Sequence, residues 1–278
     1  ARGTRSEAGM HQTSPHLLIE QLALFAQRWQ RRRASYRPAG EPFDPARCAV
    51  EPIEEGDAKR FVLAHHYSGT YPAARFRAGV FVTAPFQRER PAGVGVFSVP
   101  MNQRVIPSYF PALAFDEGVE LGRFVLDDTL AANAETWALA RMRRLLRQAL
   151  PKVRGIVAYC DPIERRDERG ELVKRGHVGT IYKAGNALYR GRSSARTLWL
   201  SPGGASFADR TLAKVRRGET GERYALERLA ALDAPRRRAG EGGAVYIRRL
   251  QDEGWLRRMQ HPGNFVFTWP EGRAGHDP

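Results

Sequence analysis

The chain has 278 residues, of which 42% are hydrophobic and 27% charged, a composition typical of a soluble globular protein. Its formal net charge of +15 favours an anionic partner such as nucleic acid, although a coding bias toward arginine explains part of the excess. No apolar run approaches the roughly 18 residues of a membrane span, so we expect no membrane partner. The two cysteines, Cys48 and Cys160, suit a reducing cytoplasm and lack metal-site spacing.

The first 45 residues are predicted to form an N-terminal arm with one amphipathic helix. Ser14-Pro15 is the predicted start, because serine caps free helix amides and proline suits the first turn. Cations suit the end of a helix, so Arg31-Arg32-Arg33 is the predicted end. Arg31 and Arg32 are also candidate DNA phosphate contacts, although a solvated helix end is the commoner meaning. The predicted apolar face consists of Leu18, Leu22, Phe25 and Trp29.

Residues 46–200 alternate predicted strands and helices, the pattern of an α/β (α+β) core with a central mixed sheet flanked by helices. Apolar, β-branched runs indicate strands, and periodic runs behind capping residues indicate helices. Asn133 is the expected cap of the longest helix. The predicted strands cover residues 48–51, 78–83, 94–99, 119–126, 155–158, 187–189 and 197–200, and the predicted helices residues 54–63, 133–150 and 178–184.

Polar side chains concentrate at two places in this core. The run His66-Tyr67-Ser68 follows the helix predicted at 54–63, where packing on the core and a functional role have equal support. Glu120 and Arg123 lie inside an apolar strand, and buried charges need either a partner or a function. Gly122 between them indicates a bulge or a close approach of backbone.

A third concentration lies between Tyr159 and Tyr189. Asp161 ends the strand predicted at 155–158, because the proline that follows it cannot continue a ladder. Ligands bind at the carboxyl ends of strands in open α/β sheets. His177 in the next loop and Tyr182 in the next helix are therefore expected near Asp161. Each residue alone suits a structural role, whereas the three together favour a functional site.

Residues 201–278 are predicted to form a basic C-terminal extension that contacts DNA or only packs on the core. Helices are predicted at 206–217, 222–232 and 245–251, followed by a hairpin whose strands are 255–259 and 265–269. Helices followed by a hairpin are compatible with a winged-helix-like module and equally with a plain extension. The candidate DNA contacts on the first of these helices are Arg210, Lys214 and Arg217.

The order of these elements resembles the acyl-CoA-dependent N-acyltransferase (GNAT) fold. The stretch from Ile181 to Asn186 is similar to its Leu-Tyr-x-x-Gly-Phe signature, in which the tyrosine protonates the departing thiolate, a role that would fall on Tyr182. The resemblance implies an acyl-CoA or related donor. The pyrophosphate-binding loop of that superfamily, Arg/Gln-x-x-Gly-x-Gly/Ala, is expected before Asn133. Residues 127–133 instead contain no glycine and two acids, which counts against ordinary CoA binding.

Over roughly residues 48–200, short motifs in matching order and spacing resemble the Mom DNA-modification proteins of Mu-type phages. The resemblance implies a GNAT-like fold and conversion of the N6 amine of adenine in double-stranded DNA to its carbamoylmethyl (methylcarbamoyl) form. It further implies a phage or prophage protein that protects phage DNA from restriction in the bacterial cytoplasm. The motifs are His66-Tyr67-Ser68, Glu120-Leu121-x-Arg123, Asp161-Pro162 and Gly176-His177-x-Gly179-x-Ile181-Tyr182-x-Ala184-x-Asn186.

The chemistry of this reaction suggests roles for the candidate residues. An aromatic exocyclic amine is a poor nucleophile, so its attack needs a base, close positioning and an activated donor. Asp161 is the expected base or hydrogen-bond acceptor for the amine, and Tyr182 the acid or donor ligand. Arg123 would anchor a carboxylate or phosphate, and Tyr67 would stack on a flipped base. The candidate catalytic set also contains His66, Ser68, Glu120, His177 and Asn186.

Other hypotheses stay open beside this one. His66, Asp161 and His177 have the composition of a two-histidine, one-carboxylate Fe(II) site. A conventional acyl-CoA-dependent N-acyltransferase acting on a protein or small-molecule amine is the second enzyme hypothesis, against which the basic charge and the missing glycine loop count. A DNA-binding regulator without catalysis is the third. A homodimer is an open expectation for the oligomeric state.

Overall fold

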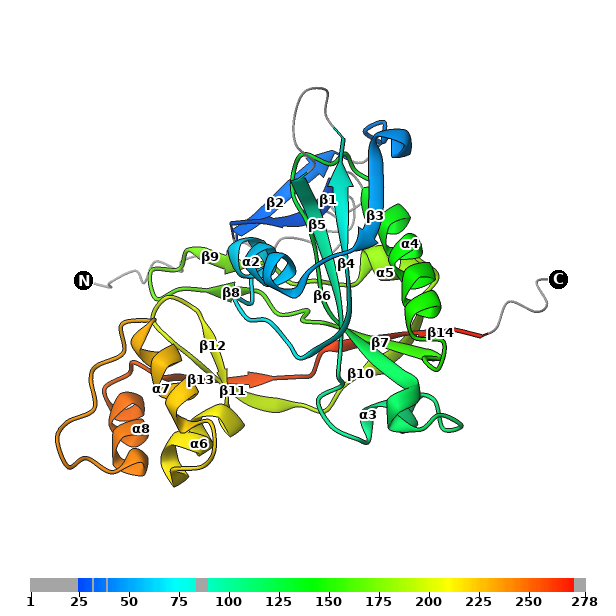
Figure 1. The fold of residues 1–278 in the computed structure, drawn as a ribbon. Coiled ribbons are helices and arrows are strands. Elements are labelled where there is room, and N and C mark those ends of the chain that lie inside the picture. Colours follow the sequence, from blue (N-terminus) through cyan, green and yellow to red (C-terminus); the bar gives the residue numbers. More distant parts are fainter. Residues whose placement is uncertain (1–24, 32, 39, 84–89, 273–278) are drawn as a thin grey trace, which may run out of the picture.

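The structure is a computed structural model, and it describes residues 25–31, 33–38, 40–83 and 90–272. Its centre is a seven-stranded mixed sheet with the order β10-β14-β7-β6-β5-β4-β3 (Figure 1). In this sheet β6 and β7 are parallel, and the other neighbouring pairs are antiparallel. The strands are β3 (Cys48–Pro52), β4 (Ala74–Val82), β5 (Arg90–Ser98), β6 (Gly118–Leu126), β7 (Gly155–Cys160), β10 (Leu188–Arg192) and β14 (Phe265–Pro270).

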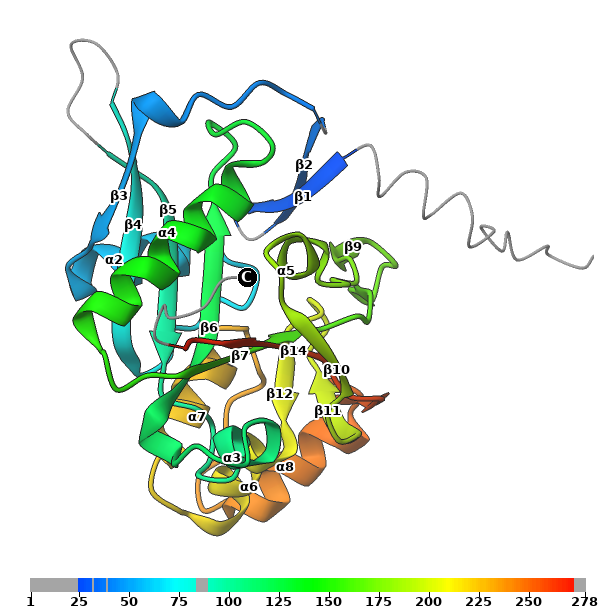
Figure 2. The same cartoon turned by 90° about the vertical axis from the view of Figure 1, so that its right-hand side faces the viewer.

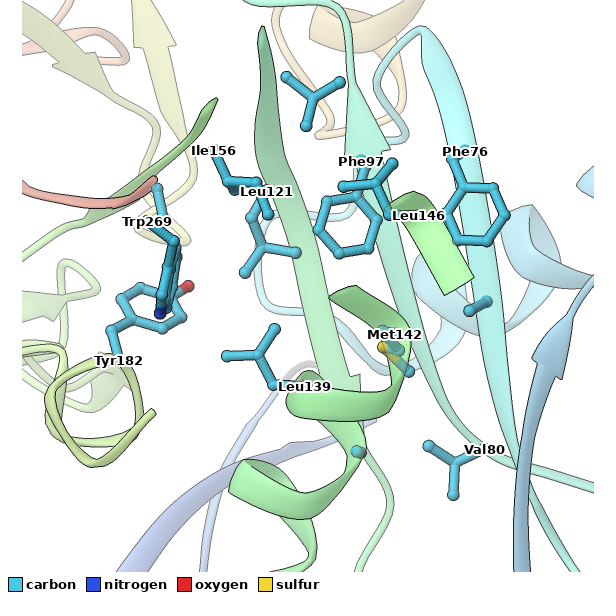
Figure 3. Packing of buried hydrophobic residues seen from close by; sticks show 14 of the residues in the cluster. Phe76, Val80, Phe97, Leu121, Leu139, Met142, Leu146, Ile156, Tyr182 and Trp269 are labelled. Carbon is cyan, nitrogen blue, oxygen red and sulfur yellow. The ribbon is translucent and has the colours of Figure 1, made fainter. Parts of the chain in front are cut away.

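Helices cover both faces of this sheet. On one face, α4 (Ala134–Ala149) packs Leu139 and Met142 into the core that Figure 3 shows. On the other face, α2 (Glu55–His65) contacts β4, β5 and β6. Successive residues of β6 serve the two faces, since Leu126 joins the core under α4 and Val125 the core under α2. The predicted mixed sheet flanked by helices is therefore confirmed.

The C-terminal region contains a second layered unit with its own core (Figure 1). Three strands form a small antiparallel sheet with the order β12-β11-β13. Three helices pack on it, and Phe207, Leu212, Ile247 and Leu250 are fully buried between them. The elements are β11 (Arg196–Leu200), β12 (Ser206–Ala208), α6 (Asp209–Arg217), α7 (Glu222–Ala230), α8 (Gly243–Asp252) and β13 (Arg257–His261).

The hairpin predicted near the C-terminus is wrong, although both of its strands exist. β13 pairs with β11 in the small sheet, whereas β14 lies between β10 and β7 in the main sheet. The turn between them contains Gly263 at φ +99°, where an added Cβ would lie 1.9 Å from the carbonyl oxygen of Ser193. This close approach directs the chain across to the main sheet instead of back along β13.

The helix predicted to end at Arg31-Arg32-Arg33 is also wrong within the described residues. Residues 25–38 instead form the antiparallel pair β1 (Phe25–Gln30) and β2 (Arg33–Pro38), with Arg31 at φ 48° between them. Tertiary contacts of Arg28 with the turn before α4 outweigh the helical periodicity. The predicted start at Ser14-Pro15, the positions Leu18 and Leu22, and Arg32 lie outside the described residues.

Short elements connect the longer ones. Asn133 precedes α4 at the predicted N-cap position, but it has a left-handed conformation and its side chain makes no capping hydrogen bond. Among the described helices none is long and apolar enough to cross a membrane. The remaining elements are the 3-10 turns η1 (Pro45–Arg47) and η2 (Phe115–Glu117), helices α3 (Val105–Tyr109) and α5 (Thr180–Ala184), and the strands β8 (Arg165–Arg166) and β9 (Leu172–Lys174).

Candidate functional site

The parallel strands β6 and β7 part after a short paired segment, and the candidate site lies where they part. On β6 the pairing with β7 runs from Gly118 to Leu121. The next residue, Gly122, is skipped in the ladder between β6 and β5, which makes it a bulge. A Cβ at Gly122 would lie 2.5 Å from Oγ of Ser98. The bulge and close approach predicted for this glycine are therefore confirmed, and they redirect the strand that carries Arg123.

The residues after α2 form a hydrogen-bonded turn beside this strand. The buried His66 accepts at Nδ1 from the backbone N–H of Ser68 at 3.2 Å, and Nδ1 lies 2.9 Å from the Ser68 hydroxyl oxygen. Tyr67 stacks on His66 with 4.4 Å between the ring centroids. Because Nδ1 is an acceptor, the neutral imidazole of His66 carries its proton on Nε2. The turn thus presents an aromatic face and a ring N–H donor in one fixed arrangement.

Arg123 extends from β6 toward this turn, and Glu120 lies three residues earlier on the same strand. The guanidinium of Arg123 donates from Nε to the carbonyl oxygen of Thr70 at 2.9 Å and from Nη2 to Thr70 Oγ1 at 2.6 Å, and Nη1 donates to the Gly122 carbonyl. Burial raises the pKa of Glu120 to about 7, although the charge of Arg123 opposes the shift. Glu120 is therefore a carboxylate poised to exchange a proton near neutral pH.

Asp161, at the carboxyl end of β7, is surrounded by donors. Its Oδ1 lies 2.9 Å from Nε2 of His261, and its Oδ2 accepts from Arg165 at 2.5 Å and lies 3.4 Å from Nζ of Lys174. The backbone N–H of Ile163 also donates to Oδ1 at 3.0 Å. Burial alone would raise the pKa of Asp161, but Lys174, Arg165 and the hydrogen bond from His261 hold it well below its usual range. Asp161 is thus a permanently ionised, fully engaged carboxylate.

Lys174 joins the Asp161 group to the turn after α2. This buried lysine on β9 donates to the carbonyl oxygens of Asp161 and Ile163, both at 2.9 Å. Its Nζ also lies 5.5 Å from the ring centroid of Tyr67. Burial lowers the pKa of Lys174 to about 8, although Asp161 opposes the shift. The ammonium group of Lys174 therefore lies against both the Asp161 group and Tyr67 of the turn after α2.

Tyr182 and His177 lie between these two groups. Tyr182 on α5 is buried and packs edge-on against Phe267 and Trp269 of β14, at centroid distances of 5.6 and 5.4 Å. Figure 3 shows Tyr182 beside Trp269. Burial raises the pKa of Tyr182 well above its usual value, so its phenol stays protonated. The His177 ring centroid lies 5.7 Å from that of Tyr182.

Three histidines in the site share one local arrangement. In His66, His177 and His261, Nδ1 accepts the backbone N–H two residues later, at 3.2, 3.2 and 3.1 Å. Burial also lowers the pKa of His66 far below its usual value and that of His177 to about 4. His66 and His177 are thus neutral rings with the proton on Nε2, able to donate a hydrogen bond but poor as bases.

The structure brings together most of the predicted catalytic residues, and Asn186 is the exception. His66, Tyr67, Ser68, Glu120, Arg123, Asp161, His177 and Tyr182 come from α2, β6, β7 and α5 to the same parting of strands. Asn186 is exposed, has φ 60°, and ends α5 through its backbone N–H to Lys183 at 3.0 Å. The local backbone accounts for an asparagine at this position, because asparagine tolerates a left-handed conformation.

Arg165, Lys174 and His261 are partners of Asp161 that the sequence does not reveal. Arg165 and Lys174 lie in a loop whose many charges are typical of solvated surface. His261 lies a hundred residues from Asp161 along the chain, and it is nearly fully buried. Arg165 also donates to Ser206 Oγ at 2.9 Å, so the C-terminal unit contacts the Asp161 group through two residues.

The predicted iron triad is not assembled. Among the described residues no three or more His, Cys, Asp or Glu side chains gather closely enough to hold a metal ion. The physical reason is that Oδ1 and Oδ2 of Asp161 are directed to His261 and Arg165, and not toward His66 and His177. The hypothesis of an Fe(II) site built from His66, Asp161 and His177 is therefore wrong.

The predicted DNA contacts lie on two surfaces. Arg210 and Arg217 are exposed on α6, and Lys214 is half-buried there. Arg217 also forms an ion pair with Glu219 at 2.9 Å, which reduces its attraction for phosphate. Arg31 is exposed between β1 and β2, and Arg32 lies outside the described residues. DNA binding by these residues stays a prediction.

A mixed sheet flanked by helices, with titratable side chains gathered where two parallel strands part, defines an α/β protein with an enzyme-like site. The model of the Mom protein family matches residues 47–241, more than half of the chain. The chain therefore belongs to the Mom protein family, as the motifs around His66, Arg123, Asp161 and Tyr182 predicted.

Two further comparisons add little to this assignment. No curated protein matches the chain. A solved structure described as a "Tandem GNAT protein from the clavulanic acid biosynthesis pathway (without AcCoA)" is 9% identical, with a TM-score of 0.40 over 82% of this chain and 100% of that chain. A likeness at that level supports no inference about mechanism.

Proposed function

We propose that this protein modifies the N6 amine of adenine in double-stranded DNA, converting it to the carbamoylmethyl (methylcarbamoyl) form. Membership of the Mom family over residues 47–241 carries the proposal. The formal net charge of +15 supports it, because a protein that binds a duplex must neutralise phosphates. Encoded by a phage or prophage, such an enzyme would protect phage DNA from restriction in the cytoplasm of the bacterial host.

Glu120 fits the role of proton acceptor better than Asp161. The transfer forms a bond from adenine N6 to the methylene carbon of the incoming group. It releases one N6 proton, and the leaving group of the donor departs with its bonding electron pair. Burial raises the pKa of Glu120 to about 7, in the range that suits a general base. Asp161 has a lowered pKa and both oxygens engaged, so we assign it to hold Arg165, Lys174 and His261 in place.

The other side chains suit binding and charge stabilisation. Toward the described residues Arg123 uses three of its five N–H groups, and the other two suit binding of a carboxylate or phosphate of a ligand. The phenol of Tyr182 stays protonated and suits a donor of a hydrogen bond or proton to the departing group. Tyr67 carries the aromatic face on which a flipped adenine would stack, since an amine inside a duplex is hard to reach.

The exposed cations of α6 are the proposed phosphate contacts of the C-terminal unit. Arg210 and Arg217 are exposed, and Lys214 is half-exposed. The unit also contacts the Asp161 group through His261 and Ser206, so DNA held by α6 would be held close to the same protein core. Phosphate contacts of this kind supply most of the affinity of a DNA-modifying enzyme without reading sequence.

Mass spectrometry of nucleosides tests the proposed activity. DNA from cells that express the chain should contain an adenine derivative whose added mass equals one carbamoylmethyl group. A modified protein or small-molecule amine with unmodified DNA would support the conventional N-acyltransferase instead. DNA binding without any new product would support a regulator, and either result would overturn the proposal.

A further inference from the structure

The N-terminus of α4 is where an acyl-CoA enzyme of the GNAT type would hold the pyrophosphate of its donor. A helix end binds phosphate when its backbone N–H groups are free and its surroundings are positive or neutral. In this protein the turn before α4, residues 127–133, is instead engaged by the N-terminal hairpin β1–β2. Figure 2 shows this hairpin beside one end of α4.

Arg28 of β1 fixes that turn from inside. Its side chain is only 2% exposed, and its guanidinium donates to the carbonyl oxygens of Asp127 at 2.9 Å and Ala131 at 2.7 Å, and to that of Leu130. Its Nε also pairs with the buried Glu135 of the first turn of α4 at 2.6 Å. One buried side chain therefore ties the whole turn to the hairpin.

Carboxylates accept two backbone N–H groups of the turn that leads into α4. Glu41 accepts the backbone N–H of Ala132 at 3.2 Å, and Arg37 of β2 donates to Glu41 from Nε at 2.9 Å. Asp127 accepts the backbone N–H of Thr129 at 2.9 Å. The turn in front of the helix is thus occupied by acids of the protein itself.

The local charge also opposes a pyrophosphate. The carboxylates around the turn are Glu41, Asp127, Asp128 and Glu135, and the guanidiniums bonded to them are Arg28, Arg37 and Arg90. A bound pyrophosphate would meet four carboxylates, and the three arginines are already engaged. Like charges in a partly buried setting disfavour such binding strongly. The residues present therefore do not fit the pyrophosphate of CoA.

We propose that the hairpin β1–β2 closes the N-terminus of α4, so that this protein takes a donor that is not held through a pyrophosphate there. The proposal rests on the proposed DNA modification, because it concerns the donor of that reaction. It excludes donors that are bound through a pyrophosphate at the N-terminus of α4. Binding to the turn can be measured without any catalytic activity, so the two proposals fail separately.

Amide hydrogen exchange of the full chain with CoA, and separately with inorganic pyrophosphate, tests the closure. We expect the exchange of residues 127–136 to be unchanged by either probe, whether or not CoA binds elsewhere on the protein. Slower exchange of these amides in the presence of CoA or pyrophosphate would overturn the proposal.

Substitution of Arg28 tests the tie between hairpin and turn. Arg28→Met should speed exchange of residues 127–131 by about 10-fold or more, because the carbonyl oxygens lose their buried donor. The control Arg31→Met changes an exposed residue between the same two strands and should leave the turn unaffected. If Arg28→Met does not fold, Glu41→Gln replaces it, and faster exchange at Ala132 is expected. Unchanged exchange in the folded variant would overturn the proposal.

Discussion

At the scale of single residues, two carboxylates at the same site have opposite properties. Glu120 is half-buried, and the loss of water around it outweighs the charge of Arg123 and a backbone hydrogen bond from Met101, so its pKa rises to about 7. Asp161 is buried among three cationic or hydrogen-bonding side chains, and its pKa falls. Environments that separate the pKa values of neighbouring groups commonly divide the acid, base and anchoring roles of an active site.

The pH dependence of stability should expose Glu120. Its pKa is near 4.5 in the unfolded chain and about 7 in the folded protein, so the folded state binds a proton that the unfolded state releases. The contribution of Glu120 to the free energy of unfolding is therefore greatest below about pH 4.5 and declines by roughly 3 kcal/mol as the pH rises through 7. Denaturant melts from pH 4.5 to 8 should show this decline, and Glu120→Gln should abolish it. An unaltered pH profile in the variant would show that Glu120 is not buried as described.

Removal of the Asp161 charge should destabilise the protein. Asp161→Asn leaves the buried Lys174 and Arg165 without their carboxylate, a change that costs roughly 3–5 kcal/mol when a buried pair is broken. The matched control Asp116→Asn breaks an exposed, solvent-screened pair with Lys152 and should leave stability nearly unchanged. Equal melting curves for the two variants would refute an anchoring role for Asp161.

At the scale of elements, the turn between β13 and β14 decides the C-terminal topology. Gly263 has φ +99° and no room for a Cβ. Gly263→Ala should therefore lower the free energy of unfolding by roughly 1–3 kcal/mol. Gly203→Ala, with nothing within 4 Å of the added Cβ, is the control and should change stability little. Chemical denaturation measures the free energy of unfolding of both variants. A Gly263→Ala protein as stable as the wild type would contradict the described turn.

Local patterns predicted the core elements, and distant contacts explain what they missed. The apolar runs predicted β6 and β7, and the helical periodicity predicted α4. These predictions succeeded because the apolar residues of each element are the ones that it buries in the core. The helix expected at Phe25 and Trp29 failed, because Arg28 draws that segment into a hairpin against α4. The partners of Asp161 were missed for the same reason, since His261 reaches it from a strand a hundred residues later.

At the scale of the whole molecule, the C-terminal unit and the core share one site. β14 returns from the small sheet into the main sheet beside β7, and His261 at the end of β13 contacts Asp161. The position of α6 relative to the core is therefore fixed by buried contacts on both sides. Cations on α6 then have a defined place relative to the proposed active site.

The salt dependence of DNA binding tests the role of α6. Replacement of Lys214 and Arg217 by glutamine should weaken binding equally for unrelated sequences. Each lost phosphate contact should reduce the slope of log K against log salt by about 1. Arg248→Gln on α8, where the arginine pairs with Asp252, is the control. A double variant whose slope equals that of the control would assign α6 to packing alone.

The proposed function is tested most directly by counting modified adenine in DNA from cells that express the wild-type chain, Glu120→Gln or the control Asp116→Asn. The wild type and the control should yield a carbamoylmethyl adenine nucleoside at similar levels. Glu120→Gln should yield roughly 10²-fold less while it folds and binds DNA normally, because the proton acceptor is lost. Absence of any adenine derivative with the folded wild-type protein would contradict the proposed DNA modification, and undiminished modification by Glu120→Gln would contradict the proposed base.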